Sequence, residues 1–150
     1  MHPFDLKTIV FAKHAQHVVL IHFPIALFIV GVAFDFLAEW RKQRLLAAAA
    51  YYNFFVAALL TIPVLVTGIL AWQWQLEGQR LKGVLLMHLV AGCVSSALIW
   101  LVWLVHKRTK REQGAAVLPG YRLTVEAVTV ALIMLTGHLG GFLSGVNGPS

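Results

Sequence analysis

The chain carries no charged residue between Arg44 and Glu77. A run of that length, mostly apolar, can cross the hydrocarbon core of a bilayer, which is about 30 Å thick. Soluble domains rarely contain such a run, and the whole chain agrees with this: 59% of its 150 residues are hydrophobic, only 12% are charged, and the mean hydropathy is +0.78. The sequence therefore indicates an integral membrane protein.

Three further apolar runs accompany the first, and the predicted spans are about 15–39, 47–74, 83–105 and 123–145. Helices are expected because backbone groups in lipid need partners within their own segment, whereas a membrane barrel would show short alternating strands. We predict an all-α, up-down-up-down four-helix bundle covering residues 1–150, with no separate soluble domain. The apolar run nearest the amino terminus, about 15–39, is too long for a cleaved signal peptide, so we expect it to remain as a span.

The basic residues are distributed unevenly between the two ends of the predicted bundle. We define side A as the end where the first span begins and side B as the opposite end. Eight of the twelve basic residues fall on side B: Arg41, Lys42, Arg44, Lys107, Arg108, Lys110, Arg111 and Arg122. The positive-inside rule then predicts that side B is cytoplasmic and that both termini lie outside. Because basic loops there face anionic lipid, the net charge of +6 does not call for a nucleic-acid partner.

The histidines gather near side A. Five of the seven open or close a predicted span there: His14, His17, His22, His88 and His138. At about 1.5 Å per helical residue their depths overlap. Ring nitrogens at membrane depth are costly unless partnered, so these residues are candidates for a functional site. The other two, His2 and His106, are expected to be solvated in the amino-terminal tail and in a basic loop.

Haem b is the cofactor that this gathering of histidines favours. A haem iron accepts one axial histidine from each face of the porphyrin, so the two ligands must come from different helices. His17 and His22 cannot serve one iron, because five residues place them roughly 140° apart around a helix. One arrangement pairs His22 with His88 and leaves His17 to His138, either as a second haem site or as a hydrogen-bonded pair.

Two carboxylates, Asp35 and Glu126, lie well inside the apolar runs, and both are predicted toward side B. Local ion pairs are the plainer interpretation, with Asp35 bound to Arg41 or Lys42 and Glu126 bound to Arg122. The alternative is a relay that passes protons to a quinone site. The five tryptophans lie near predicted span ends and are expected to form interfacial belts: Trp40, Trp72, Trp74, Trp100 and Trp103.

The segment 17–27, HVVLIHFPIAL, resembles the His-Pro-x-x-x-His-Phe-Pro-Ile-Ala-Leu signature of a bacterial membrane family. The family is catalogued as domain of unknown function twenty-two thirty-one. The resemblance runs to about residue 141, and Val18 departs from it where the family usually has proline. Its further matches are Asp35, Gly68, Trp72, His88 and the pair Gly140-Gly141. The resemblance implies a small four-span protein, often found alongside c-type cytochromes and respiratory components.

Three functions are compatible with these features. The leading one is a haem b subunit that passes electrons between quinone or a periplasmic cytochrome and a larger redox complex, with an apolar shell of Phe23, Leu85 and Met87 around the haem. The second is a cofactor-free structural or anchoring subunit of a membrane complex. The third is a metal or proton pathway. The sequence has no metalloprotease helix, phosphate-binding loop or nucleophile elbow, so we do not expect a stand-alone enzyme.

Overall fold

A computed structural model describes residues 15–111 and 120–145 of the chain, and these ranges contain four helices. They are α2 (Ala15–Arg41), α3 (Arg44–Gln75), α4 (Gly83–Arg111) and α5 (Arg122–Leu143). All four are long and apolar enough to cross a membrane, which confirms the predicted all-α, four-span fold. Helix α4 continues beyond the predicted end of its span. Basic side chains suit the carboxyl end of a helix, so the basic segment extends α4 instead of starting a loop.

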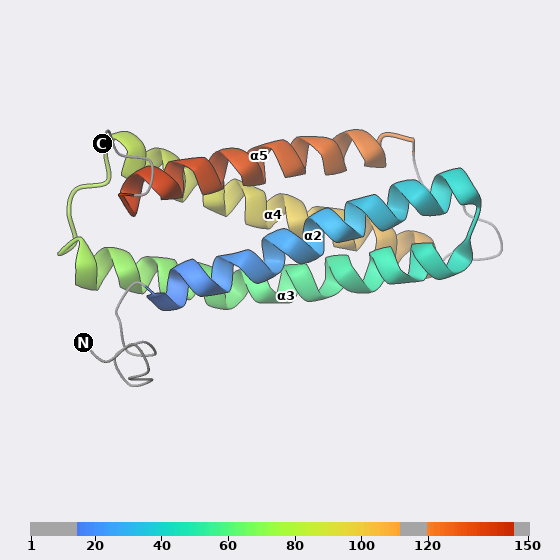
Figure 1. The fold of residues 1–150 in the computed structure, drawn as a ribbon, viewed down its shortest axis with the longest axis horizontal. Coiled ribbons are helices and arrows are strands. Elements are labelled where there is room, and N and C mark those ends of the chain that lie inside the picture. The colour runs from blue at the N-terminus through green and yellow to red at the C-terminus, as the bar shows by residue number, and fades with distance from the viewer. Residues whose placement is uncertain (1–14, 112–119, 146–150) are drawn as a thin grey trace.

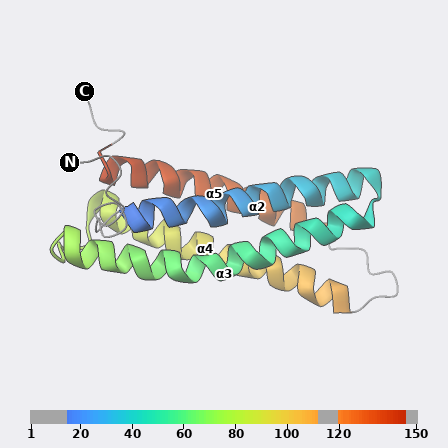
Figure 2. The same cartoon turned by 60° about the horizontal axis from the view of Figure 1, so that its bottom comes forward.

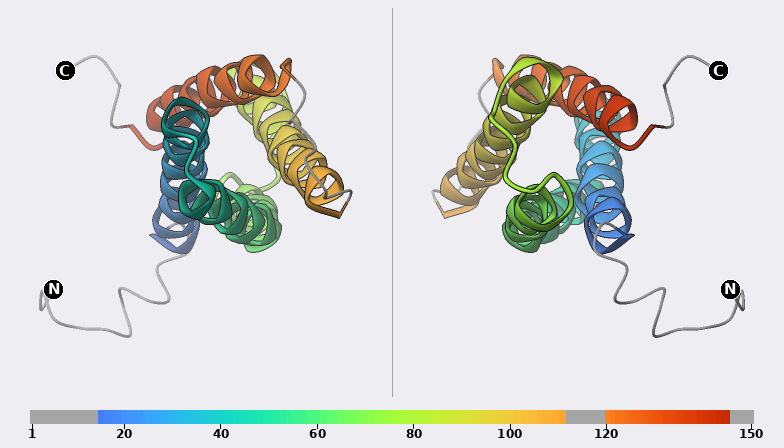
Figure 3. Two further views of the ribbon diagram at one scale, coloured as in Figure 1. Left: turned by 90° about the vertical axis from the view of Figure 1, so that its right-hand side faces the viewer. Right: turned by 90° about the vertical axis from the view of Figure 1, so that its left-hand side faces the viewer.

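Successive helices run in opposite directions, so the start of α2 and the end of α5 lie at the same end of the bundle (Figures 1 and 2). This end is side A. Each helix packs on the next along the chain, and α5 packs back on α2. The four helices therefore form a ring in which α2 and α4 stand diagonally opposite (Figure 3). Helices α2 and α5 are closest toward side B and separate toward side A (Figures 1 and 3).

The buried core occupies the middle of the bundle and its side B half. Its members are Phe28, Ala50, Phe54, Ala57, Ala58, Ile99, Val102, Trp103 and Ile133. Ile133 is the member nearest the side A end of α5, and the helix continues from it to Leu143, roughly 15 Å farther. Nearer side A, Ala91 and Leu139 are also buried but lie outside this cluster.

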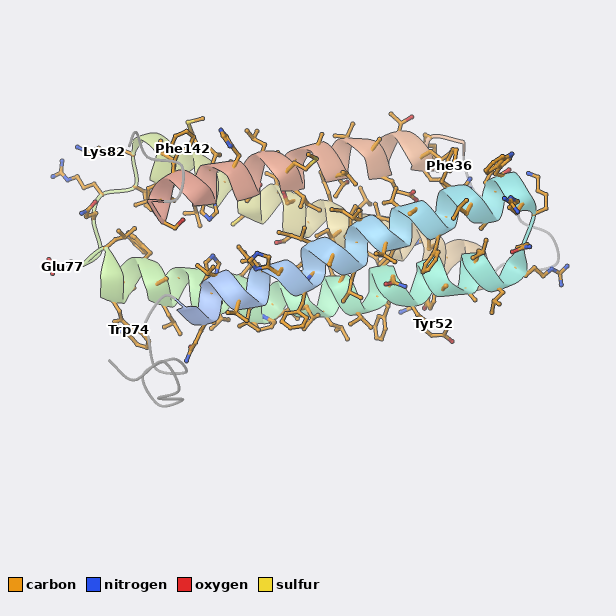
Figure 4. All side chains as sticks on the ribbon, in the orientation of Figure 1. Phe36, Tyr52, Trp74, Glu77, Lys82 and Phe142 are labelled. Carbon is orange, nitrogen blue, oxygen red and sulfur yellow. The ribbon has the colours of Figure 1, made fainter. Side chains whose placement is uncertain are left out.

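The outer surface of the bundle is apolar, as lipid contact requires. Phe36, Tyr52, Trp74 and Phe142 point away from the bundle axis, while Glu77 and Lys82 extend beyond its side A end (Figure 4).

The tryptophan prediction is only partly correct. Trp40 and Trp74 are exposed near helix ends, as an interfacial belt would be. Trp103, in contrast, is buried, and the indole Nε1 of Trp100 donates a hydrogen bond to Thr61 Oγ1 at 3.1 Å. The two indole rings meet edge to face, with centroids 5.4 Å apart, and belong to the contact between α3 and α4, because α4 is longer than its predicted span.

Candidate functional site

Two histidines meet inside the bundle near side A. His17 on α2 and His88 on α4 come from diagonally opposite helices, and both side chains are half-buried. Their ring centroids are 6.5 Å apart and their planes are perpendicular. Rings in direct contact elsewhere in the bundle lie closer, as Phe54 and His106 do at 4.8 Å. His17 and His88 therefore face one another edge to face across the bundle.

Hydrogen bonds hold both rings in the same protonation pattern. The Thr67 hydroxyl donates to the carbonyl of Pro63 at 2.8 Å, so its lone pair accepts the Nδ1–H of His17 at 3.2 Å. His88 donates its own Nδ1–H to the carbonyl of Thr136 at 3.0 Å, since a carbonyl can only accept. A neutral imidazole that donates from Nδ1 keeps its lone pair on Nε2. Each ring is thus arranged as metal-binding histidines are, with one nitrogen anchored and the other able to coordinate.

Glycines make room for both rings. A Cβ atom added at Gly68 would lie 3.0 Å from Cε1 of His17, and one added at Gly140 would lie 3.1 Å from Cε1 of His88. Distances this short are below ordinary van der Waals contact, so a side chain at either position would push the ring away. Gly68 on α3 and Gly140 on α5 therefore allow the imidazoles to approach the neighbouring helix closely.

The predicted pairing of His22 with His88 is not what the structure brings together. His22 is exposed on the outer surface and donates its Nδ1–H to the Val18 carbonyl of its own helix at 2.6 Å. His138 is also exposed and packs against Phe142 rather than near His17. The physical reason is the helix rotation: the face of α2 that enters the bundle carries His17, and His22 lies on a different face. His14 lies outside the described residues.

The predicted apolar shell is likewise only partly placed around these rings. Phe23 and Met87 are both more than half exposed and point outward, whereas Leu85 is half-buried. The residues in contact with the rings are instead Thr67 and Gly68 at His17, and Thr136 and Gly140 at His88.

A second polar cluster lies inside the bundle near side B and includes a histidine that we expected to be solvated. His106 on α4 is only 5% exposed. Its Nε2 atom lies 3.4 Å from Oδ1 of Asp35 on α2 and 3.6 Å from Oε1 of Glu126 on α5. Asp35 and Glu126 are themselves 1% and 0% exposed. The expectation for His106 was wrong because α4 continues past the predicted span and carries this ring into the core.

The ion pairs of this cluster join different helices, whereas we expected local ones. Arg122 on α5 donates from Nε to Oδ2 of Asp35 at 2.7 Å and from Nη2 to Oε2 of Glu39 at 3.1 Å. Lys42 binds Glu39 at 2.5 Å, not Asp35. Glu126 makes no ion pair with Arg122 within the described residues. Asp35 is therefore fixed by Arg122 of the last helix instead of by Arg41 or Lys42, which follow it at the end of α2.

A cavity of about 90 Å³ adjoins this cluster between α4 and α5. His106, Arg122 and Glu126 contribute to its wall, together with Leu101, Val102, Val105, Tyr121 and Val125. Tyr121 and Leu101 are exposed, so the cavity reaches the surface of the bundle. Its volume corresponds to about three water molecules at the density of the liquid.

The comparisons with known proteins bear on the family alone. The family model described as "Predicted membrane protein (DUF2231)" matches residues 13–148. The chain belongs to this family. No curated protein and no solved structure matches it.

In this DUF2231 chain, the His17–His88 pair and the side B cluster are related by a regular spacing in the sequence. Asp35 follows His17 by eighteen residues and His106 follows His88 by eighteen, which is five full turns at 3.6 residues per turn. Each pair therefore shares one helix face, about 27 Å apart along the axis. Once the inner face of α2 is known, this spacing places His17 and Asp35 on it together and His88 and His106 on one face of α4.

Proposed function

We propose that this protein is a haem b-binding membrane subunit that transfers electrons between the quinone pool or a periplasmic c-type cytochrome and a larger redox complex. His17 and His88 are the proposed axial pair. The observation that carries this proposal is their arrangement across the bundle, with a centroid distance of 6.5 Å and both Nδ1 atoms already bound.

The distance between the rings suits a shared metal. A metal held from opposite sides by two imidazoles, at about 2 Å from each nitrogen, separates the ring centroids by roughly 6 Å. The lone pairs on Nε2, inferred from the hydrogen bonds, are the ones that coordination requires.

Small residues lie beside the two rings and leave room close to them. Gly68 and Gly140 leave room for the rings to lie close to α3 and α5. When bound, haem would supply a one-electron couple whose potential depends on axial ligands, hydrogen bonds to them and burial.

The hydrogen-bond partners of the two imidazoles would position them in such a site. Thr67 and the carbonyl of Thr136 orient the imidazoles and raise their basicity by accepting Nδ1–H, as outer hydrogen-bond partners of metal ligands do. A hydrogen bond of 3.2 Å between the hydroxyls of Ser95 and Thr136 also connects α4 to α5, about two turns beyond His88 along α4. The half-buried position near one end of the bundle keeps the site within reach of a partner at side A.

The same proposal places the protein in a bacterial inner membrane with side A periplasmic. The basic residues on side B support this orientation through the positive-inside rule. A periplasmic side A puts the His17–His88 pair close to the compartment in which c-type cytochromes operate. A quinone would reach the bundle from the lipid.

Absorption spectroscopy tests the cofactor directly. We expect the full-length protein, purified from cells able to make haem, to show a Soret band and split visible peaks on reduction. The variant His88→Ala should lose these bands, while His138→Ala, on an exposed face, should keep them. A colourless wild-type protein, even after addition of haem to the membranes, would contradict the proposal.

A further inference from the structure

Three hydrogen-bond acceptors face one another in the side B cluster. The Nδ1–H of His106 donates to the carbonyl of Val102 at 2.9 Å, so the ring, when neutral, presents the lone pair of Nε2 to Asp35 and Glu126. The Nε2 atom and both carboxylate oxygens of Glu126 are buried without a hydrogen-bond partner among the described residues. Buried acceptors pointed at each other are unfavourable unless a positive charge lies between them.

We propose that Asp35, His106 and Glu126 form a binding site for a divalent transition-metal ion. One ligand atom from each residue lies within 4.8 Å of the other two, and all three side chains are buried. The site is distinct from the His17–His88 pair, because the two lie near opposite ends of the bundle.

The distances suit such an ion. Two ligands bound at about 2.0–2.1 Å in tetrahedral geometry lie roughly 3.3 Å from each other. The Nε2 atom of His106 lies 3.4 Å from Asp35 Oδ1 and 3.6 Å from Glu126 Oε1, close to that value. The carboxylates of Asp35 and Glu126 repel one another when no ion lies between them. An ion would offset this repulsion and draw the two ligand oxygens, which lie within 4.8 Å, closer together.

The two oxygens of Asp35 have separate roles in this arrangement. Oδ2 accepts from Arg122, and Oδ1 points toward His106. A carboxylate held by a cation on one oxygen and binding metal with the other has its orientation fixed by its outer partner. Arg122 therefore positions Asp35 and does not occupy the proposed site.

The charges also favour a cation. Arg122 offsets Asp35, and Lys42 offsets Glu39, which leaves Glu126 with His106 at 3.6 Å as its ion-pair partner, and only when that ring is protonated. A carboxylate at membrane depth needs such a partner. One imidazole and two carboxylates suit zinc, manganese or iron, whereas magnesium prefers oxygen ligands alone.

The adjoining cavity supplies access and the remaining ligands. His106, Arg122 and Glu126 line it, and its exposed rim opens near side B. Its volume of about 90 Å³ has room for waters that could complete the coordination of an ion bound by three protein ligands.

Metal content of the purified full-length protein tests the proposal. The protein carries a tag without histidine, and His17→Ala and His88→Ala are present throughout, so that the side A histidines cannot bind the ion. After treatment with EDTA, it is equilibrated with Zn²⁺, desalted and analysed by elemental mass spectrometry. We expect one Zn²⁺ per chain and a higher thermal unfolding midpoint with Zn²⁺ than with Mg²⁺.

Three variants locate the ion. Glu126→Gln and His106→Gln should each weaken Zn²⁺ affinity at least about tenfold, since loss of outer hydrogen-bond partners alone costs roughly 10–100-fold. Glu39→Gln is the matched control, because this carboxylate also binds Arg122 but is exposed. It should retain the ion.

Two results would overturn the proposal. One is a wild-type cluster that retains no Zn²⁺ and shows no shift in unfolding, which would mean that protons alone neutralise it. The other is wild-type affinity in both Glu126→Gln and His106→Gln. If His106→Gln does not fold, Glu126→Gln still decides, because it keeps the shape of the side chain and removes a buried charge.

Discussion

Oδ2 of Asp35 lies 2.7 Å from Nε of Arg122, and this buried ion pair connects α2, the first of the four helices, to α5, the last. Removing one partner of a buried pair leaves the other charge uncompensated and typically costs about 3–5 kcal/mol. We therefore expect Arg122→Gln to lower the free energy of unfolding by that amount in metal-free protein, as measured by denaturant titration in detergent micelles.

Lys42→Gln is the natural comparison, because Lys42 and Arg122 both bind Glu39 but only Arg122 reaches Asp35. The Lys42–Glu39 pair is exposed, and such pairs contribute little in water. We expect no measurable loss of stability. Equal effects of the two substitutions would show that the link to Asp35 is not what stabilises this end of the bundle.

Substitution of Gly140 tests the position of the His88 ring. Gly140→Ala places a Cβ 3.1 Å from Cε1 of this ring and should displace it, whereas Gly137→Ala on the same helix meets nothing within 4 Å. In haem-loaded protein we expect Gly140→Ala to lower the haem content or shift the reduced absorption peaks. Gly137→Ala should match the wild type, and identical spectra from both variants would argue against the proposed ligand.

The hydrogen bond from Trp100 to Thr61 gives a third prediction. Thr61→Val removes the acceptor of a buried indole N–H between α3 and α4, and interhelical hydrogen bonds in membrane proteins contribute about 0.6 kcal/mol, with a maximum near 1.7. We expect a loss of about 1 kcal/mol in unfolding free energy. Thr129→Val is the control, because that buried hydroxyl bonds only to the Val125 carbonyl of its own helix. It should cost clearly less.

The four spans could be predicted from the sequence because apolar runs between charged clusters have one reasonable interpretation in a bilayer. The side A position of the histidines followed from the same alternation. Helix rotation was harder, since these helices are apolar on every side and hydrophobicity does not distinguish the lipid-facing side from the inner one. That is why His22, rather than His17, was expected opposite His88.

The side B cluster was missed for a different reason. The charged residues Lys107 and Arg108 appeared to end the third span, which placed His106 in a loop. Asp35 was assigned to neighbouring cations because contacts between distant segments cannot be read from a single sequence. The spacing of eighteen residues from His17 to Asp35 was available, but it becomes informative only when the inner face of α2 is known.

Reporter fusions test the proposed orientation. Full-length chains that end in alkaline phosphatase or in a green fluorescent protein should show phosphatase activity and no fluorescence, because the carboxyl end of α5 is proposed to be periplasmic. The excess of Lys and Arg on side B is the physical reason. A fluorescent fusion without phosphatase activity would reverse the orientation and place the His17–His88 pair on the cytoplasmic side.

The most direct test of the central claim is the number of haem groups per chain in two histidine variants of one helix, determined as the pyridine haemochrome. His17→Ala removes a ring that faces His88 inside the bundle, and His22→Ala removes an exposed ring bound to its own helix. We predict one haem b per wild-type chain, wild-type content in His22→Ala and loss of haem in His17→Ala. Full haem content in His17→Ala, or none in the wild type, would contradict the account.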